Sequence, residues 1–243
     1  MEKERIKGNR DKELPLGEHL EELRRRIILS LIAIVIFGGV AYVFRGRLLN
    51  FLLGLSPARS MIYLHPTEAF LTYLKLAGIS GIVLSTPWIL YQVWRFIFPA
   101  LLEKETRYLR VGFLAGGVAF YIGVGLALIY GVPLILTLLS RVGGASLEMR
   151  LSIRNYVSFV SLLCFSVGLV FEIPLIILLL VRAGIVSAET LRRNRKYAIT
   201  IAFAVAAFLT PTDVFSQALM AVPLVLLYEF SVLLVRYGKI GPR

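Results

Sequence analysis

The chain has 243 residues, of which 58% are hydrophobic and 17% are charged. A soluble domain of this length does not need so much apolar surface, so the composition predicts an integral membrane protein and excludes a soluble enzyme or nucleic-acid-binding domain. The formal net charge of +12 indicates membrane topology and no nucleic-acid partner, because Lys and Arg residues concentrate in alternate loops.

Residues 1–26 are polar, and we expect them to form a cytoplasmic segment that is too charged to be a cleaved signal peptide. Six apolar runs follow, and each is predicted to be a membrane-spanning helix: residues 27–44, 68–94, 109–131, 157–181, 197–210 and 217–235. We therefore expect an all-α integral membrane protein, with residues 27–236 as one six-span bundle and residues 237–243 as a cytoplasmic tail. The larger outer segments are expected at residues 45–66 and 134–154.

Four prolines predict where these helices are distorted. Pro87, Pro174 and Pro223 should kink the second, fourth and sixth spans, and Pro133 should end the helical register of the third. The fifth span has only 14 residues, about 21 Å of helix, against a hydrocarbon core of about 30 Å. We expect the last two spans to form a short hairpin, with local thinning of the bilayer or screening by neighbouring helices.

The distribution of basic residues predicts the orientation. With a cytoplasmic N-terminus, the inner segments hold 20 Lys and Arg residues and the outer segments hold six, while Lys75 lies within the second span. Because Lys and Arg accumulate in cytoplasmic loops, this excess predicts a multi-pass protein of the cytoplasmic (inner) membrane with both termini in the cytoplasm.

Glu172 is the only acidic residue within residues 157–181, and an ionised carboxylate near the bilayer centre costs about 2.5–3.5 kcal/mol. It shares one helical face with small residues at spacings of three and four: Ser158, Ser161, Cys164 and Gly168. Two interpretations stay open. The face packs against another helix with Glu172 protonated and hydrogen-bonded, or it lines a functional polar pocket.

Metal and nucleophile chemistry are not supported. His19 and His65 are predicted on opposite sides of the membrane and cannot share an ion, and Cys164 is the single cysteine. Because no Ser/His/Asp or paired-carboxylate arrangement falls within one span, we expect no catalytic residues, no metal and no cofactor. One alternative function, a proton-coupled small-solute transporter that uses Glu172, is weakened by the absence of an internal repeat.

Carboxylates from two inner segments, Glu21 and Glu22 before the first span and Glu103 and Glu105 after the second, can converge on a cationic ligand. A guanidinium group matches a carboxylate with two parallel hydrogen bonds, so such a site prefers arginine to lysine. The alternative is local neutralisation by neighbouring Arg and Lys residues, which contributes little energy. On charge alone this alternative is favoured; the partners would be Arg25 or Arg26 in the first segment and Lys104 or Arg107 in the second.

Three polar residues lie at the turn of the final hairpin: Thr210, Asp213 and Gln217. Asp213 is expected to cap the sixth span by accepting a backbone N–H. Gln217 enters the membrane one turn later, where its amide can bond a polar side chain on another helix.

These residues, in this order, resemble the TatC family, the multispanning component of the twin-arginine protein translocase. The resemblance runs from His19 to Tyr237. It rests on the sequences HLEELR at 19–24, PWILYQVWRF at 87–96, FEIP at 171–174, RKY at 195–197 and LTPTDVFSQ at 209–217. One departure is Ser152, since many members of the family have an acidic residue at the outer start of the fourth span.

The resemblance implies a cupped bundle that acts as the receptor for the paired-arginine signal peptide of folded cargo. It implies a signal-peptide-binding surface of Glu22, Arg24, Phe96 and Glu105, which reverses the preference for local neutralisation. It places Glu172 on the concave face. It also implies that TatA-like and TatB-like single-span subunits dock at Thr210, Phe215 and Gln217, that copies of the chain assemble, and that the proton-motive force drives export.

Overall fold

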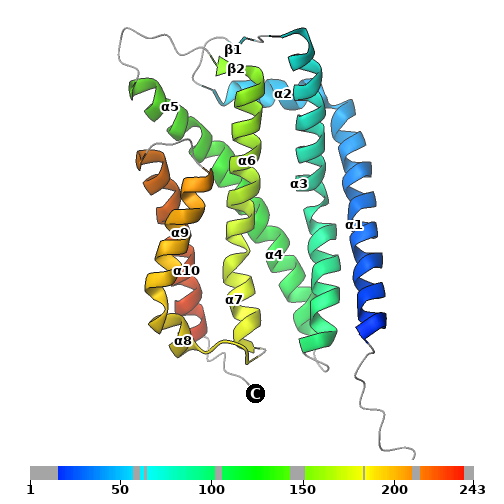
Figure 1. The fold of residues 1–243 in the computed structure, drawn as a ribbon, viewed down its shortest axis with the longest axis vertical. Helices are drawn as coiled ribbons and strands as arrows, with labels where there is room; N and C mark the ends of the chain where they lie inside the picture. The colour runs from blue at the N-terminus through cyan, green and yellow to red at the C-terminus, as the bar shows by residue number, and fades with distance from the viewer. Residues whose placement is uncertain are drawn as a thin grey trace, which may run out of the picture.

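The computed structural model describes residues 16–56, 61–62, 65–101, 106–142, 151–182, 184–209 and 214–237. Within these ranges the fold is almost entirely helical (Figure 1). The α-helices are α1 (Leu16–Val43), α2 (Arg45–Gly54), α3 (Pro66–Leu101), α4 (Thr106–Leu126), α5 (Val132–Val142), α6 (Ile153–Phe171), α7 (Ile173–Arg182), α8 (Ala188–Arg193), α9 (Arg195–Leu209) and α10 (Val214–Tyr237). A π-helical turn, η1 (Ala127–Gly131), joins α4 to α5, and two short strands, β1 (Met61–Ile62) and β2 (Leu151–Ser152), pair in parallel.

Five helical stretches of the described chain are long and apolar enough to cross a bilayer: His19–Val43, Pro66–Phe96, Gly112–Arg141, Ile153–Arg182 and Met220–Tyr237. The prediction of an all-helical membrane protein is therefore confirmed. The predicted fifth span corresponds to α9, which is not among these five, because its 15 residues extend only about 22 Å.

The helices form a bundle in which α1 lies along α3, α6 and α7 occupy the middle, and α9 and α10 form a hairpin at the opposite side (Figure 1). The first turn of α1, the last turn of α3, helix α8 and the last turn of α10 all lie at one end of the molecule, which we call the α1 N-terminal end (Figure 1). The α2 helix and the two strands lie at the other end.

Two glycines let α1 and α3 approach closely. A Cβ atom added to Gly81 would lie 2.6 Å from the Cα of Gly38 and 2.9 Å from the carbonyl oxygen of Ile34, which is closer than real Cβ contacts. Small residues at the crossing of two membrane helices permit backbone contact of this kind, where van der Waals packing drives association. The glycines therefore fix where α1 lies against α3.

Pro87 lies inside α3, which continues from Pro66 to Leu101. Because proline has no N–H, it cannot donate to the carbonyl of Val83 four residues earlier. The hydroxyl of Tyr121 on α4 donates a hydrogen bond to that carbonyl at 3.1 Å. A side chain of a neighbouring helix thus satisfies the backbone acceptor that the proline leaves open.

The loss of helical register expected near Pro133 is present as the π-helical turn η1, but residues 134–142, which were expected in an outer loop, are helical. In η1 the N–H of Val132 donates to the carbonyl of Ala127, five residues back, and α5 then continues to Val142. Pro133, the second residue of α5, directly follows this wider turn. Because Val132 and Ile135 are fully buried, this helix is part of the core, and the predicted outer loop does not include residues 134–142.

The predicted distortion of the fourth span at Pro174 is confirmed. The α6 helix ends at Phe171, α7 begins at Ile173, and Glu172 lies between them. The N–H of Glu172 donates to the carbonyl of Leu169 at 3.1 Å, so the chain tightens into a single turn before α7 continues. The interruption places the Glu172 side chain at the junction of two helices.

At the end of the molecule opposite the α1 N-terminal end, polar contacts join α3 to the start of α6. The buried carboxylate of Glu68, near the start of α3, accepts hydrogen bonds from the hydroxyl of Ser152 and from the N–H of Arg154 at 3.3 Å. A carboxylate at the N-terminus of α6 also interacts favourably with the helix dipole. Another helix, α3, therefore supplies an acidic group at the start of α6, where this chain has Ser152.

Candidate functional site

The α1 N-terminal end holds a polar cluster between α1 and α3. The rings of His19 and Phe96 stack, with centroids 4.4 Å apart and planes 13° from parallel. One or two helical turns away, Arg26 donates a hydrogen bond from Nη1 to Oε1 of buried Gln92 at 3.2 Å. Because spacings of three and four residues place side chains on one helical face, Glu22 lies on α1 between His19 and Arg26.

Glu22 and Arg26 form an ion pair within α1, and the guanidinium group donates from both Nε and Nη2 to one carboxylate oxygen. The side chain of Glu22 is 33% exposed, whereas that of Arg26 is 13% exposed. Local neutralisation, one of the two interpretations of these charges, is therefore present in this state of the protein. The Glu22 carboxylate nevertheless keeps an accessible side.

The structure places the four residues of the predicted signal-peptide surface differently. Glu22 and Phe96 belong to one surface through His19 and Arg26. Arg24 is exposed and, among the described residues, makes no hydrogen bond or ion pair. Glu105 lies outside the described residues.

Sequence reasoning named Arg26 as a partner of Glu22 but did not place two residues, His19 and Gln92, in this cluster. The signal that finds them is their helical spacing, with His19, Glu22 and Arg26 on one face of α1 and Gln92 and Phe96 on one face of α3.

The small-residue face of α6 is a packing surface. Ser161, Cys164 and Glu172 are each 5% exposed, and a Cβ on Gly168 would lie 2.6 Å from the ring of Phe120 on α4. The structure therefore supports the packing interpretation of this face.

The Glu172 carboxylate lies against the backbone of α4, since a Cβ on Gly116 would be 2.9 Å from Oε2. No described residue forms a hydrogen bond with buried Oε1. The packing interpretation includes a hydrogen-bond partner for Glu172, and none is present for this atom within the described ranges.

In the final hairpin, Gln217 donates a hydrogen bond from Nε2 to the carbonyl of Phe203 at 3.1 Å. The sequence predicts a bond to a polar side chain of another helix, and the acceptor is instead the backbone of α9. Thr210 and Asp213 lie outside the described residues, and only the backbone of Phe215, in α10, is described. Arg195 and Glu229 join the other end of the hairpin through an ion pair of 2.8 Å.

Within the described part of the chain, no group of three or more His, Cys, Asp or Glu residues is arranged to hold a metal ion. The polar contacts instead gather at the ends of long apolar helices. This fold and this site define a multi-pass, all-helical membrane protein with a polar surface at the α1 N-terminal end.

Residues 18–223 match the family described as Sec-independent protein translocase protein (TatC), and the chain belongs to this family. The TatC protein of Carboxydothermus hydrogenoformans is 40% identical over 232 residues, which cover 94% of this chain and 96% of that protein. The TatC protein of Aquifex aeolicus is 39% identical over 236 residues, covering 95% and 97%.

A crystal structure described as the twin arginine translocase receptor TatC superimposes with a TM-score of 0.82 at 38% identity, covering 91% of this chain and 99% of that one. Membership of a translocase family agrees with the expectation that the chain is not an enzyme, and it replaces the alternative of a small-solute transporter.

Proposed function

We propose that this protein is the receptor subunit of a twin-arginine translocase and binds the paired-arginine signal peptide of folded cargo at the α1 N-terminal end. The observation that carries the proposal is the surface formed by Glu22, His19 and Phe96, where an accessible carboxylate lies beside a stacked aromatic pair. The family and the solved receptor structure support the same function.

The ion pair between Glu22 and Arg26 suggests how an arginine of the peptide is bound. An incoming guanidinium group takes the place of Arg26 on the Glu22 carboxylate, and Arg26 retains its hydrogen bond to Gln92. This exchange replaces one charge-assisted bond of Glu22 with another, while the displaced Arg26 keeps only the neutral amide of Gln92 as an acceptor. We assign the second peptide arginine to Glu105, and we assign Arg24 a role in shaping the site.

We propose six spans with both termini in the cytoplasm. The excess of 20 inner over six outer Lys and Arg residues supports this topology. The first turn of α1 and the last turn of α10 lie at the same end of the molecule, in agreement with an even number of crossings (Figure 1). On this assignment α9 is the short fifth span, and the α1 N-terminal end faces the cytoplasm.

The hairpin of α9 and α10 is the proposed docking site for TatA-like and TatB-like single-span subunits, through Thr210, Phe215 and Gln217. Further copies of the chain assemble with it, and the proton-motive force drives export. Glu172 acts after recognition, where the signal peptide or a partner helix inserts into the membrane. Its carboxylate is suited to this role because an inserted polar group would supply the partner that Oε1 lacks among the described residues.

The test is binding of an Arg-Arg signal peptide and of its Lys-Lys version to the detergent-solubilised protein. We expect the Arg-Arg peptide to bind about tenfold more tightly, because guanidinium groups match carboxylates with paired hydrogen bonds. Glu22→Gln and Glu105→Ala should each remove most of this preference. Glu229→Gln, at an ion pair of the hairpin, is the matched control and should keep it. Equal binding of the two peptides by the unaltered protein would disprove the recognition site.

A further inference from the structure

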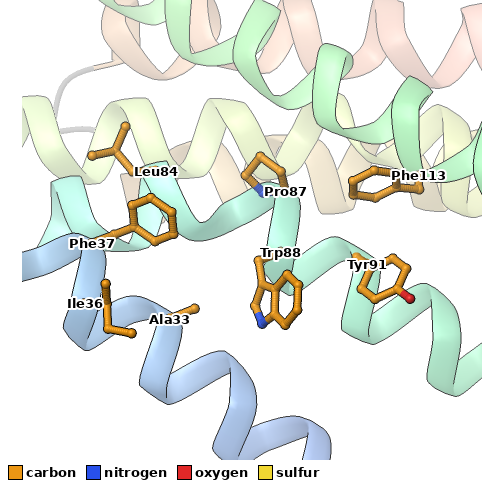
Figure 2. Close-up of a pocket in the computed structure, with 8 residues that line it drawn as sticks. All are labelled: Ala33, Ile36, Phe37, Leu84, Pro87, Trp88, Tyr91 and Phe113. Atoms are coloured by element: carbon orange, nitrogen blue, oxygen red, sulfur yellow. The ribbon is translucent and has the colours of Figure 1, made fainter.

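An apolar groove opens between the α1 N-terminal end and the middle of the bundle, where α1, α3 and α4 meet (Figure 2). Its volume is about 630 Å³, and it is lined by Ala33, Ile36, Phe37, Leu84, Pro87, Trp88, Tyr91 and Phe113. A second groove of about 470 Å³ continues along α4 and shares Pro87 and Phe113 with the first. The two apolar grooves are therefore adjacent and share two lining residues.

Bulky side chains line the first groove. Phe37, Trp88, Tyr91 and Phe113 stand around it (Figure 2), and the Tyr91 and Phe113 rings make an edge-on contact with centroids 5.8 Å apart. Membrane helices associate through small residues that let backbones approach. Because these walls hold a second helix away, a thin and flexible occupant fits the groove better than a transmembrane segment does.

A cationic group stands at the mouth of the groove. Arg95 continues the face of α3 formed by Leu84, Trp88 and Tyr91, and its Nη1 lies 3.4 Å from the Tyr91 hydroxyl. Its side chain is exposed. In the ranges that the structure describes, no carboxylate pairs with Arg95 and no acceptor bonds the indole N–H of Trp88.

We propose that the two grooves hold the acyl chains of an anionic phospholipid of the cytoplasmic leaflet, whose phosphate is bound by Arg95. The assignment to that leaflet rests on the proposed topology. Arginine binds phosphate oxygens through paired, charge-assisted hydrogen bonds, and the hydroxyl of Tyr91 and the indole N–H of Trp88 add donors at the depth of the head group. The exposed Arg24 and Arg25 add positive charge at the same end of the molecule, which favours anionic over zwitterionic lipids.

Native mass spectrometry of the purified full chain tests the proposal, with added phosphatidylglycerol and phosphatidylcholine of the same acyl chains. We expect the unaltered protein to prefer phosphatidylglycerol by about tenfold, because the cationic choline of phosphatidylcholine offsets the attraction of its phosphate to Arg95. Arg95→Gln should abolish the preference, because it weakens binding of phosphatidylglycerol more than binding of phosphatidylcholine, whose phosphate carries a cationic choline. Arg47→Gln, at another exposed arginine, in α2, is the control and should keep the preference.

A second variant tests the contribution of the groove to lipid binding separately from that of Arg95. Ala33→Leu fills the first groove and should weaken binding of both lipids several-fold while the preference between them persists. Equal affinity of the unaltered protein for the two lipids would overturn the proposal, as would an unchanged preference in Arg95→Gln. Binding of phosphatidylglycerol with six-carbon chains as tight as that of the long-chain lipid would also overturn it, because the grooves would then have no part. Peptide binding, measured separately, distinguishes failure of this site from failure of the receptor function.

Discussion

Two side chains of this protein form hydrogen bonds with the backbone of a helix other than their own. Tyr121 belongs to α4, yet its hydroxyl bonds the backbone of α3 at Val83, where Pro87 removes a donor. Glu68 belongs to α3, yet it caps α6 through the N–H of Arg154. In a bilayer no water replaces such bonds, so each one joins two elements that would otherwise expose an unpaired backbone group.

Removing the Tyr121 hydroxyl should therefore destabilise the protein. We expect Tyr121→Phe to lower the free energy of unfolding by about 0.5–1.5 kcal/mol, measured by denaturant titration in detergent. In a Pro87→Ala background the cost should shrink, because the alanine backbone would supply the N–H that the Val83 carbonyl needs. Tyr130→Phe is the control, since Tyr130 is exposed and its hydroxyl bonds no described residue. An equal loss of unfolding free energy in both backgrounds would show that the Tyr121 hydroxyl does not stabilise the protein through the Val83 carbonyl.

The polar residues show where sequence reasoning succeeds and where it stops. The pattern around Glu172 predicted a buried face with a distortion at Pro174, because helical periodicity and proline geometry are local properties. The partners of Gln217 and Ser152 depend on which helices meet, which local patterns do not encode, whereas the partner of Glu22, Arg26, lies four residues away in the same helix and was among the residues named from the sequence. Within the sequence, only the family resemblance brought Glu22 and Phe96 to one surface.

At the scale of elements, the close contact between α1 and α3 depends on residue 81 being a glycine, which has no side chain. The backbone of Gly38 occupies the space where a Cβ of Gly81 would lie. Helices α1 and α3 were predictable from hydropathy, since each carries a long apolar run. Their contact point was not, because several glycines in each helix are equivalent in the sequence. The continuation of α5 beyond Pro133 was missed for a related reason, since the π-helical turn before it has no clear sequence signature.

The glycine contact gives a prediction with an internal control. Gly81→Ala should destabilise the protein by about 1–3 kcal/mol, because the methyl group meets backbone atoms that cannot move without separating α1 from α3. Gly78→Ala, one turn earlier in the same helix, meets nothing within 4 Å and should leave stability unchanged or slightly higher. Thermal unfolding in detergent measures both variants. Equal stability of the two would contradict the close approach.

At the scale of the whole molecule, the bundle has helices of unequal length. The α3 helix has 36 residues and α9 has 15, so one side of the protein suits a thick membrane and the other a thin one. A helix shorter than the hydrocarbon core is accommodated by thinning of the bilayer, at a cost that grows with the mismatch. On the proposed assignment of α9 as the fifth span, we expect the bilayer to be thinner beside α9.

This mismatch predicts a dependence on bilayer thickness. In nanodiscs, the temperature of unfolding should be several degrees higher in lipids with 14- or 16-carbon chains than in lipids with 22-carbon chains, because thinner bilayers need less deformation around α9. A variant with four leucines inserted in the middle of α9 should shift the optimum toward thicker bilayers. An optimum that is unchanged by the insertion would show that α9 does not set the local thickness.

The placement of α1 also has an evolutionary consequence. This helix packs almost entirely along α3, and residues such as Leu31, Ile32 and Val35 face outward. Exchanging one apolar residue for another on that face replaces one lipid contact with a similar one, so drift there is nearly neutral. The same exchange at Gly81 separates two helices. Among descendants of this chain, the outward face of α1 away from the groove and from His19 and Glu22 is free to diverge, while the narrow line along which α1 meets α3 is held constant by selection.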